Sequence, residues 1–466
     1  MTHETRLAVL GLMILALADP AMGGQVGRVV VTVREADGDG LLPCRAWVDF
    51  EGKRHFQPAD ASCTPYPRDR SFSCEGRFEI EVPAGRATIH VERGKEYPPV
   101  EAAVDVKPGV VTPTEIRLTR WVNMRQEGWY SSDMHVHFGA DRLEVLKQLA
   151  RADDVNWLPV FSYWNDFHEK WPAWPHGSSV SAGDGYLVTL ANEEIERIGG
   201  DPYHSVGAIF IFGIEKPVYV QRHDKHYPCD AALAKIAKRT TPSCVIDTDK
   251  PLWAENVVTM GLGLFDSVQV CHNHYHRDHD LPMGWGMIGA EIEDEARDWG
   301  SDELMIRTNM IYYRWLNCGF RLAVSGGAAM GVMPVPLGHS RTYAKLDGPL
   351  TEANYLKALQ AGRTFATSGP MLTMTVDGHE VGDVISRQSS TASPLKVRVQ
   401  LRSVEPIDSL ELVHDGRVIR QISLAGQSVS PVLDRRLEGN LTPQRSGWVA
   451  ARAVYRAPTG RLRQVN

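Results

Sequence analysis

Apolar and polar residues alternate near both ends of the chain, with the two-residue period of half-buried β-strands. Residues 78–82 and 395–402 both follow this pattern, and Asp415-Gly416 is a dipeptide typical of a tight hairpin. Short strands of this kind predict two β-sandwich modules, over residues 24–120 and 371–466.

In the middle of the chain, residues 121–370, the pattern changes to alternating strands and helices. Strand-like apolar runs occur at 155–161, 186–190, 206–211 and 267–270. Helical spacing occurs at 231–238, 303–315 and 351–361. This alternation predicts an α/β fold, a βα barrel whose site collects residues from the carboxyl ends of its strands. Toward the end of the chain, the strand 448–455 is followed only by a turn, so the last sandwich is expected to lack a final strand.

The most conspicuous polar pattern is Asp133-Met134-His135-Val136-His137. If this segment is extended, Asp133, His135 and His137 all point to one face. Neutral imidazole is the commonest protein ligand of Zn, Fe and similar ions, so the pattern predicts a metal site. For His-x-His alone, hydrogen-bonded or packed histidines would be the more frequent explanation.

Further ligand-capable groups follow other predicted strands. Glu193 and Glu194 end one strand, His204 precedes another, and His274 lies in a stretch with four histidines in eight residues, 272–279. Several such groups at the strand ends of one barrel favour a metal centre over isolated core histidines.

Length and charge limit the possibilities. The 466 residues suggest about three domains. The net charge is −7 and no basic cluster is dense enough to follow a row of phosphates, which argues against nucleic acid as a partner. We expect a small-molecule substrate instead.

The N-terminus has the pattern of a secretory signal peptide over residues 1–23. Arg6 precedes an apolar run, 7–18, and small residues then lead to Gly23. The run is short for a bilayer, and no later stretch has the roughly 20 apolar residues of a transmembrane helix. The sequence therefore predicts a secreted or periplasmic protein without a transmembrane anchor.

Export would permit disulfides among the seven cysteines. Sequence cannot assign their pairing. Cys63 with Cys74, and Cys229 with Cys244, are the local pairs to test first, and Cys271 could be a buried thiol beside the site.

The segment GWYSSDMHVHFG resembles the opening motif of the PHP (polymerase and histidinol phosphatase) metallohydrolases, and more closely that of their CehA/McbA branch. The resemblance continues through ANEEI, DSVQVCHNH and ALQAGRTFATSGP, and it covers roughly residues 127–378. The module at 24–120, with its VPAG turn, is similar to carboxypeptidase regulatory-like modules.

The resemblance implies a PHP-like distorted (βα)7 barrel with a divalent metal centre that hydrolyses esters, carbamates or phosphoesters. His135 and His137 match the family's paired histidines, Glu194 its bridging carboxylate and His274 a later histidine; His204 matches more loosely.

The sequence also departs from the family pattern. Tyr163-Trp164 stands where an Asp-His pair is usual, and residues 325–329 lack the usual Ser-Asp-x-His. The retained residues support one ion, at most two (Zn, Mn or Fe). His135, His137 and His274 would hold it together with Glu194 or Asp247.

Such an ion would activate a water molecule. Asp133, Asp247 or Glu193 could accept its proton, and Lys250 or Arg341 could stabilise negative charge. Salt bridges that fix a loop are an equal explanation for Lys250 and Arg341. Three functions follow: hydrolysis of a small ester, amide or carbamate; phosphoester hydrolysis; or binding of a glycan or envelope component without turnover.

Overall fold

The structure is a computed structural model. It describes residues 25–66, 68–139, 142–164, 179–196, 207–218, 229–253, 255–275, 301–387, 393–457 and 460–466. The predicted signal segment and His204 lie outside the described residues. None of the helices in these ranges is long and apolar enough to cross a membrane.

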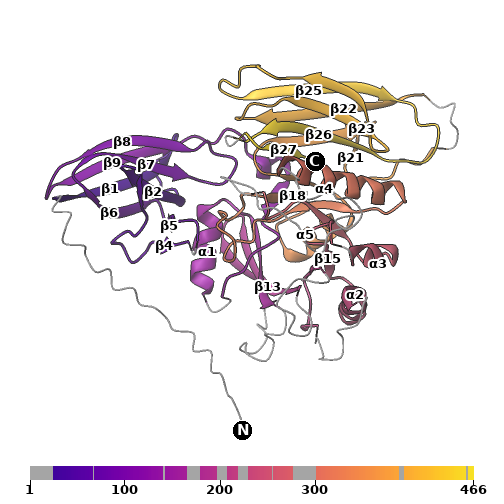
Figure 1. The fold of residues 1–466 in the computed structure, drawn as a ribbon, viewed down its shortest axis with the longest axis horizontal. Helices are drawn as coiled ribbons and strands as arrows, with labels where there is room; N and C mark the ends of the chain where they lie inside the picture. Colours follow the sequence, from indigo (N-terminus) through magenta and orange to yellow (C-terminus); the bar gives the residue numbers. More distant parts are fainter. Residues whose placement is uncertain are drawn as a thin grey trace, which may run out of the picture.

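The N-terminal module consists of two packed sheets (Figure 1). One sheet has the order β6-β1-β9, with β1 (Val26–Glu35), β6 (Arg77–Pro83) and β9 (Val111–Leu118). The other has the order β4-β5-β2-β7-β8, with β3 paired to β2. Its strands are β2 (Cys44–Phe50), β3 (Lys53–His55), β4 (Thr64–Pro65), β5 (Phe72–Cys74), β7 (Gly85–Glu92) and β8 (Val100–Val106). The alternation seen in the sequence buries one face of each main strand, as in β6, where Phe78, Ile80 and Val82 are buried.

The central domain is built on a ten-stranded sheet with the order β17-β16-β15-β14-β13-β11-β10-β18-β19 and β12 beside β13. Its strands are β10 (Trp129–Ser132), β11 (Trp157–Trp164), β12 (Ser179–Gly183), β13 (Tyr186–Ile195), β14 (Ile209–Phe212), β15 (Val245–Asp247), β16 (Ser267–Cys271), β17 (Ala323–Gly326), β18 (Arg341–Lys345) and β19 (Thr364–Thr367). The two edge strands of this sheet, β17 and β19, come close together, which shows that the sheet is strongly curved. The hydroxyl of Thr364 on β19 donates a hydrogen bond to the carbonyl of Val324 on β17 at 2.7 Å.

The predicted (βα)7 barrel is wrong. β14 pairs antiparallel with both β13 and β15, and β18 pairs antiparallel with both β10 and β19. The described residues contain five α-helices and many more strands, and four of the five sheets belong to the two flanking β modules. Apolar periodicity identifies a segment as a strand but carries no information on its direction, which long-range pairing decides.

Six strands of the central sheet nevertheless run in one direction. Parallel pairs join β10 to β11, β11 to β13, β15 to β16, and β16 to β17. β14 lies antiparallel between β13 and β15, so these two also run the same way. The carboxyl ends of all six strands therefore meet at one edge of the sheet, where the residues that follow them can form a site.

The helices are α1 (Leu143–Ala152), α2 (Cys229–Thr240), α3 (Asn256–Gly261), α4 (Ser301–Asn317) and α5 (Glu352–Gln360), with a 3-10 turn, η1 (Met124–Glu127). At the start of α5 the Thr351 side chain accepts a hydrogen bond from the backbone N–H of Asn354, and after its end Gly362 has φ +73°.

The C-terminal module is a second sandwich, drawn in yellow in Figure 1, that lies across one end of the central domain. Its sheets have the orders β21-β20-β22-β25 and β24-β23-β26-β27. The strands are β20 (Met371–Val376), β21 (His379–Glu380), β22 (Leu395–Ser403), β23 (Ser409–His414), β24 (Arg417–Ser423), β25 (Leu433–Leu441), β26 (Val449–Arg456) and β27 (Leu462–Val465). Asp415 and Gly416 form the β23–β24 turn with φ of +50° and +81°, as a tight hairpin requires. A further strand that was not expected from the sequence, β27, pairs antiparallel with β26.

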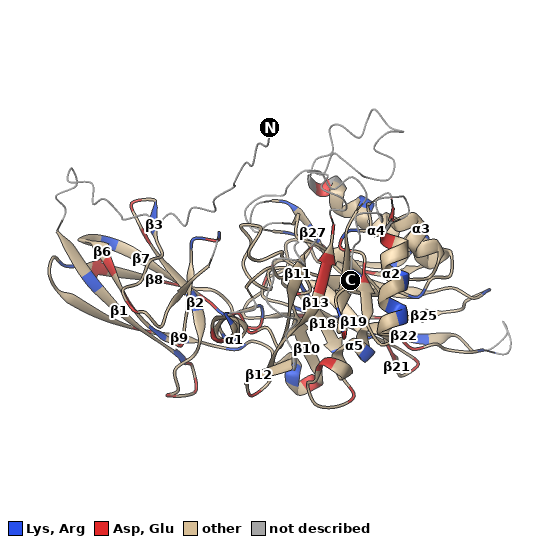
Figure 2. Ribbon diagram, turned by 90° about the horizontal axis from the view of Figure 1, so that it is seen from below, with Lys and Arg blue, Asp and Glu red and all other residues tan. Residues whose placement is uncertain are grey.

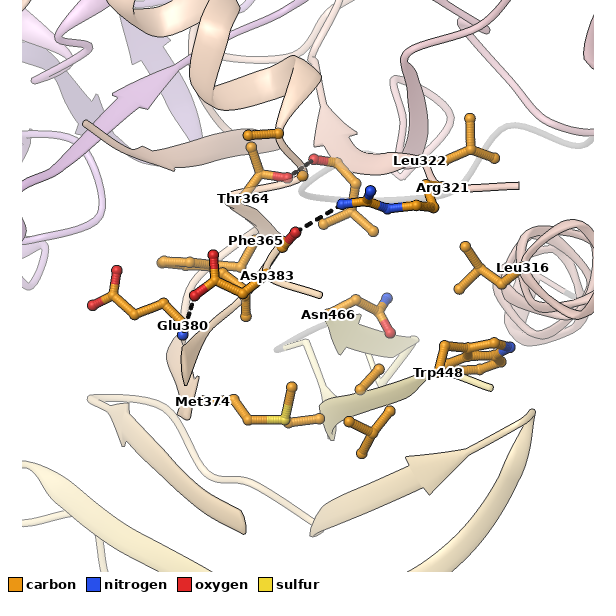
Figure 3. A pocket seen from close by; sticks show the side chains of 18 of the residues that line it. Leu316, Arg321, Leu322, Thr364, Phe365, Met374, Glu380, Asp383, Trp448 and Asn466 are labelled. Atoms are coloured by element: carbon orange, nitrogen blue, oxygen red, sulfur yellow. Dashed lines mark hydrogen bonds between the residues drawn. The ribbon is translucent and has the colours of Figure 1, made fainter. Parts of the chain in front are cut away.

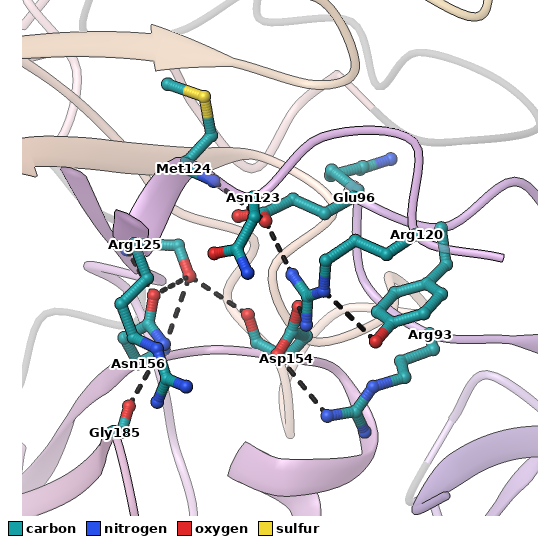
Figure 4. Close-up of polar contacts among 12 residues, drawn as sticks. Arg93, Glu96, Arg120, Asn123, Met124, Arg125, Asp154, Asn156 and Gly185 are labelled. Carbon is teal, nitrogen blue, oxygen red and sulfur yellow. Dashed lines mark hydrogen bonds and ion pairs between the residues drawn. The ribbon is translucent and has the colours of Figure 1, made fainter. Parts of the chain in front are cut away.

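A buried network of charges joins the N-terminal module to the central domain (Figure 4). Arg93 and Arg120 both bind Asp154, at 3.4 and 2.9 Å, and Arg120 also binds Glu96 at 2.5 Å. Asp154 and Glu96 are almost fully buried, so the pairs lie in a low-dielectric environment and their geometry holds the two units in one orientation.

Candidate metal centre

The segment that follows β10 is held by the carboxylate of Asp133. Its Oδ1 accepts hydrogen bonds from the backbone N–H groups of His135 (3.0 Å) and Ala328 (2.9 Å), and its Oδ2 accepts one from Gly338 (2.7 Å). Asp133 is fully buried, and burial raises its pKa to about 7 in spite of these bonds. The segment is therefore not the regular strand that the sequence suggested. Asp133 binds backbone groups, and its predicted role as a proton acceptor stays a prediction that this geometry does not favour.

The two histidines of this segment converge on Glu194, at the end of β13. Nε2 of His135 lies 2.9 Å from Nε2 of His137. Glu194 Oε2 lies 2.9 Å from His137 Nε2, and its Oε1 lies 3.7 Å from His135 Nε2. The ligand atoms of the three residues all lie within 4.8 Å of one another. Figure 2 shows the acidic residues of β13 as a red band in the interior of the domain. The structure thus brings together three of the five predicted ligands.

Burial dominates the electrostatics of this cluster. The side chains of His135, His137 and Glu194 are 4%, 10% and 2% exposed. Burial, reinforced by the charges of His137 and Lys250, lowers the pKa of His135 well below its usual value. Burial also raises the pKa of Glu194 to about 7, against the opposing effect of His137. A neutral imidazole has the protonation state that metal binding requires.

Aromatic rings enclose the histidines on one side. The ring centres of Phe161 and Phe210 lie 5.9 and 4.4 Å from that of His135, and Trp164 lies 4.8 Å from His137. Trp164 also donates a hydrogen bond from Nε1 to Glu196 at 3.0 Å. The rings restrict water near the cluster and hold the imidazoles in place.

Asp249, which was not among the predicted site residues, contacts the cluster from the loop after β15. Its Oδ1 lies 3.5 Å from Nδ1 of His135, the ring nitrogen that faces away from Glu194. The Oδ2 atom accepts hydrogen bonds from Lys250 Nζ at 2.5 Å and from Trp253 Nε1 at 3.2 Å. Asp249 has φ +54°, a strained backbone conformation for a residue with a side chain. At this distance the two atoms do not form a hydrogen bond, but a carboxylate beside the outer nitrogen of a histidine is the usual support of a metal-binding imidazole.

The other two carboxylates predicted near this loop have structural partners. Asp247 accepts hydrogen bonds from the hydroxyls of Ser267 and Ser325, both at 2.5 Å, and burial raises its pKa to about 6. Glu193 accepts a hydrogen bond from the backbone N–H of Val218 at 2.7 Å. Neither belongs to the ligand cluster among the described residues.

The two predicted cations have different surroundings. Lys250 forms an ion pair with Asp249 and lies over the Trp253 ring, 5.5 Å from its centre, so it is on the Asp249 side of the cluster. Arg341 is fully buried, and its guanidinium donates to the backbone carbonyls of Gly338 (2.7 Å), Asp153 (3.1 Å) and Asp154 (3.2 Å). These bonds favour the explanation that Arg341 fixes a loop.

The histidine-rich stretch after β16 contributes less directly. His272 is buried, stacks on Tyr275 and contacts the Thr308 hydroxyl of α4 at 3.3 Å, so it packs against that helix. His274 lies close enough for its charge to affect the pKa of His135, but it is not part of the three-residue cluster. Its role as a ligand, like that of His204, stays a prediction.

One cavity with a mainly apolar lining is separate from this cluster. It has a volume of about 260 Å³ and lies between α4, β19 and the C-terminal sandwich (Figure 3). Leu316, Phe365, Met374 and Trp448 are among its lining residues, and no residue of the histidine cluster lines it.

Comparisons with known proteins leave the site to be interpreted from its own geometry. No protein-family model and no curated protein matches the chain. Among solved structures, the TIE protein of Bacillus anthracis aligns with 12% identity over 25% of this chain and 19% of that one, at a TM-score of 0.16. The minor pilin GBS52 of Streptococcus agalactiae aligns with 14% identity over 22% of this chain and 47% of that one, at a TM-score of 0.17. Similarities this weak carry no argument about fold or function.

Proposed function

We propose that the chain is an exported metal-dependent hydrolase that acts on a small ester, amide or carbamate. The observation that carries the proposal is the convergence of His135, His137 and Glu194 at the carboxyl ends of parallel strands. The expectation of export rests on the apolar N-terminal segment of the sequence.

The three residues fit a divalent cation. Two imidazole nitrogens 2.9 Å apart can share at most one proton between them, and the buried Glu194 carboxylate faces both. Without a cation, burial makes the charged form of Glu194 unfavourable, as its raised pKa reflects. Two histidines and a glutamate are a donor set that zinc uses in hydrolytic sites, and Mn and Fe also accept these ligands.

The residues of the chain have distinct tasks in this proposal. His135, His137 and Glu194 hold the ion, and Asp249 orients the His135 ring through its outer nitrogen. Lys250 compensates the charge of Asp249, and the rings of Phe161 and Trp164 exclude water from one side. When bound, a divalent cation would make water more acidic and polarise the oxygen of a scissile bond.

Metal analysis of the purified protein tests the proposal. After incubation with Zn²⁺ and removal of unbound metal, we expect about one equivalent per chain, and its loss in the His135→Ala/His137→Ala variant. His414→Ala, a histidine on β23 in the C-terminal module, is the matched control and should bind as the wild type does. Less than about half an equivalent in the wild type would refute the proposal.

Substrate screening then tests the reaction class. The loaded protein should hydrolyse an aryl ester, and the double-histidine variant should not. Hydrolysis of an aryl phosphate in place of the ester would identify a phosphoesterase. Stoichiometric metal without turnover of either substrate class would instead indicate a binding protein built on this site.

A further inference from the structure

A cavity of about 230 Å³, with several charged side chains in its lining, lies where the three modules meet. Each module contributes a basic side chain to its lining: Lys95 from the N-terminal sandwich, Arg341 from β18 of the central sheet, and Arg463 from β27 of the C-terminal sandwich. None of the residues of the proposed metal centre lines this cavity.

One further cation of the lining is fully compensated. Arg45 lies 2.7 Å from Asp69 and 3.2 Å from Asp153, and it also forms an ion pair with Glu92. Of these, Arg45, Glu92 and Asp153 belong to the lining of the cavity, so this corner already contains its own negative charge.

Lys95 and Arg341 have no such ion pair at contact distance among the described residues, although nearby carboxylates attract both of them. Lys95 Nζ has a contact with Nδ1 of His339 at 3.5 Å, and in the described part of the chain no ion pair joins it to a carboxylate. The guanidinium of Arg341 is oriented by hydrogen bonds to backbone carbonyls, and its charge lowers the pKa values of Asp153 and Asp154 without a direct ion pair in the part of the chain that the structure describes. Arg341 is fully buried and Lys95 is partly buried, so a further negative group beside them would reduce the cost of removing their charges from water.

Two acids of the lining, Glu405 and Glu92, attract Lys95 without an ion pair to it in the described part of the chain. Burial raises the pKa of Glu405, and Lys95 opposes that rise. Burial also lowers the pKa of Lys95 to about 8, so that its attraction to Glu405 does not offset the loss of water. The ammonium group is therefore still charged at neutral pH and incompletely paired.

We infer that this junction cavity binds a small oxyanion, a carboxylate or phosphate group, between Lys95 and Arg341. The lysine supplies up to three N–H donors, and the guanidinium has five, of which the backbone occupies only some. The volume equals that of several water molecules, at about 30 Å³ each in the liquid, which suits inorganic phosphate or a short organic acid and excludes a polymer.

Calorimetric titration of the chelator-treated protein tests the inference independently of the proposed metal centre. Inorganic phosphate and succinate are the two probes, against chloride at equal ionic strength. We expect saturable binding of at least one oxyanion, and the tighter of the two identifies the preferred class. If both bind no better than chloride, the inference is wrong.

Variants then place the binding. Lys95→Met should weaken it by about tenfold or more, since a hydrogen bond from a charged group is lost. Lys95→Arg should largely retain binding, and Lys53→Met, on β3 of the same module, should leave it unchanged. Glu405→Gln removes a competing negative charge and should tighten binding severalfold, which also tests the site if Lys95→Met fails to fold. Wild-type affinity in both Lys95→Met and Glu405→Gln would overturn the assignment.

Discussion

The Nδ1 atom of His135 lies 3.5 Å from the Oδ1 atom of Asp249, although His135 follows β10 and Asp249 follows β15, far apart in the sequence. The contact faces away from Glu194, so Asp249 can orient the imidazole while the other ring nitrogen remains directed at the cluster. The left-handed backbone of Asp249 places its carboxylate there.

Asp249→Asn should weaken metal binding by about 10- to 100-fold, because the amide supports the His135 ring less well than a carboxylate does. Competition with a chromophoric zinc chelator measures the change. Asp184→Asn, at a side chain that is 99% exposed, is the control. Equal zinc affinity in Asp249→Asn and the wild type would show that the contact does not support a ligand.

Arg341→Met should destabilise the fold by about 3 kcal/mol or more, because it removes three hydrogen bonds from a charged group to buried carbonyls. Urea unfolding measures the loss, and Arg436→Met on the exposed face of β25 should change stability by less than about 0.5 kcal/mol. If Arg341→Met has unchanged stability but no hydrolytic activity, Arg341 has the catalytic role that the sequence suggested.

Oxidation should link Cys44 to Cys74 rather than Cys63 to Cys74. The first two are directly opposite each other on antiparallel β2 and β5, and their sulfur atoms lie 3.5 Å apart. Directly opposed strand residues have the Cα separation that a disulfide accepts. Peptide mapping without reductant, after treatment with oxidised glutathione, identifies the link. Cys63→Ser should retain it and Cys74→Ser should lose it; a bridge that contains Cys63 would contradict the prediction.

Glu352→Gln should stabilise the protein at neutral and higher pH. Burial raises the pKa of Glu352 to about 7 from 4.5, and its Oε1 atom has no hydrogen-bond partner in the described part of the chain. The folded state holds the proton of Glu352 more tightly than the unfolded state does. The protonated side chain therefore contributes its full stabilisation of the wild-type fold below pH 4.5, and this contribution is lost as the pH rises through about 7. Between pH 5 and 8 we expect wild-type stability to fall by about 1–2 kcal/mol relative to Glu352→Gln, after allowance for partial exposure.

The same comparison with Glu438→Gln, at an exposed position of β25, should show no such pH dependence. If the stability difference between wild type and Glu352→Gln is the same at pH 5 and pH 8, the pKa of Glu352 is not raised in the folded state.

Local features of the fold could be predicted from the sequence alone. Alternation identified β6 and β22, and the dipeptide Asp415-Gly416 identified the β23–β24 turn, because these depend on neighbouring residues. His135 and His137 could be named as ligands from their spacing, and Glu194 from its place at a strand end and from the family resemblance. The structure then brought the three together.

What the tertiary structure decided depends on residues distant in the sequence. The direction of β14 and β18 is set by their pairing partners, which is why the predicted barrel was wrong. Asp133 looked like a ligand or base, but backbone N–H groups of Ala328 and Gly338, some two hundred residues away, bind its carboxylate. The contact of Asp249 with His135 could not be predicted from the sequence, since it exists only when β10 and β15 share one sheet. Periodicity reports which face of an element is buried; only the packed chain determines which polar groups face each other there.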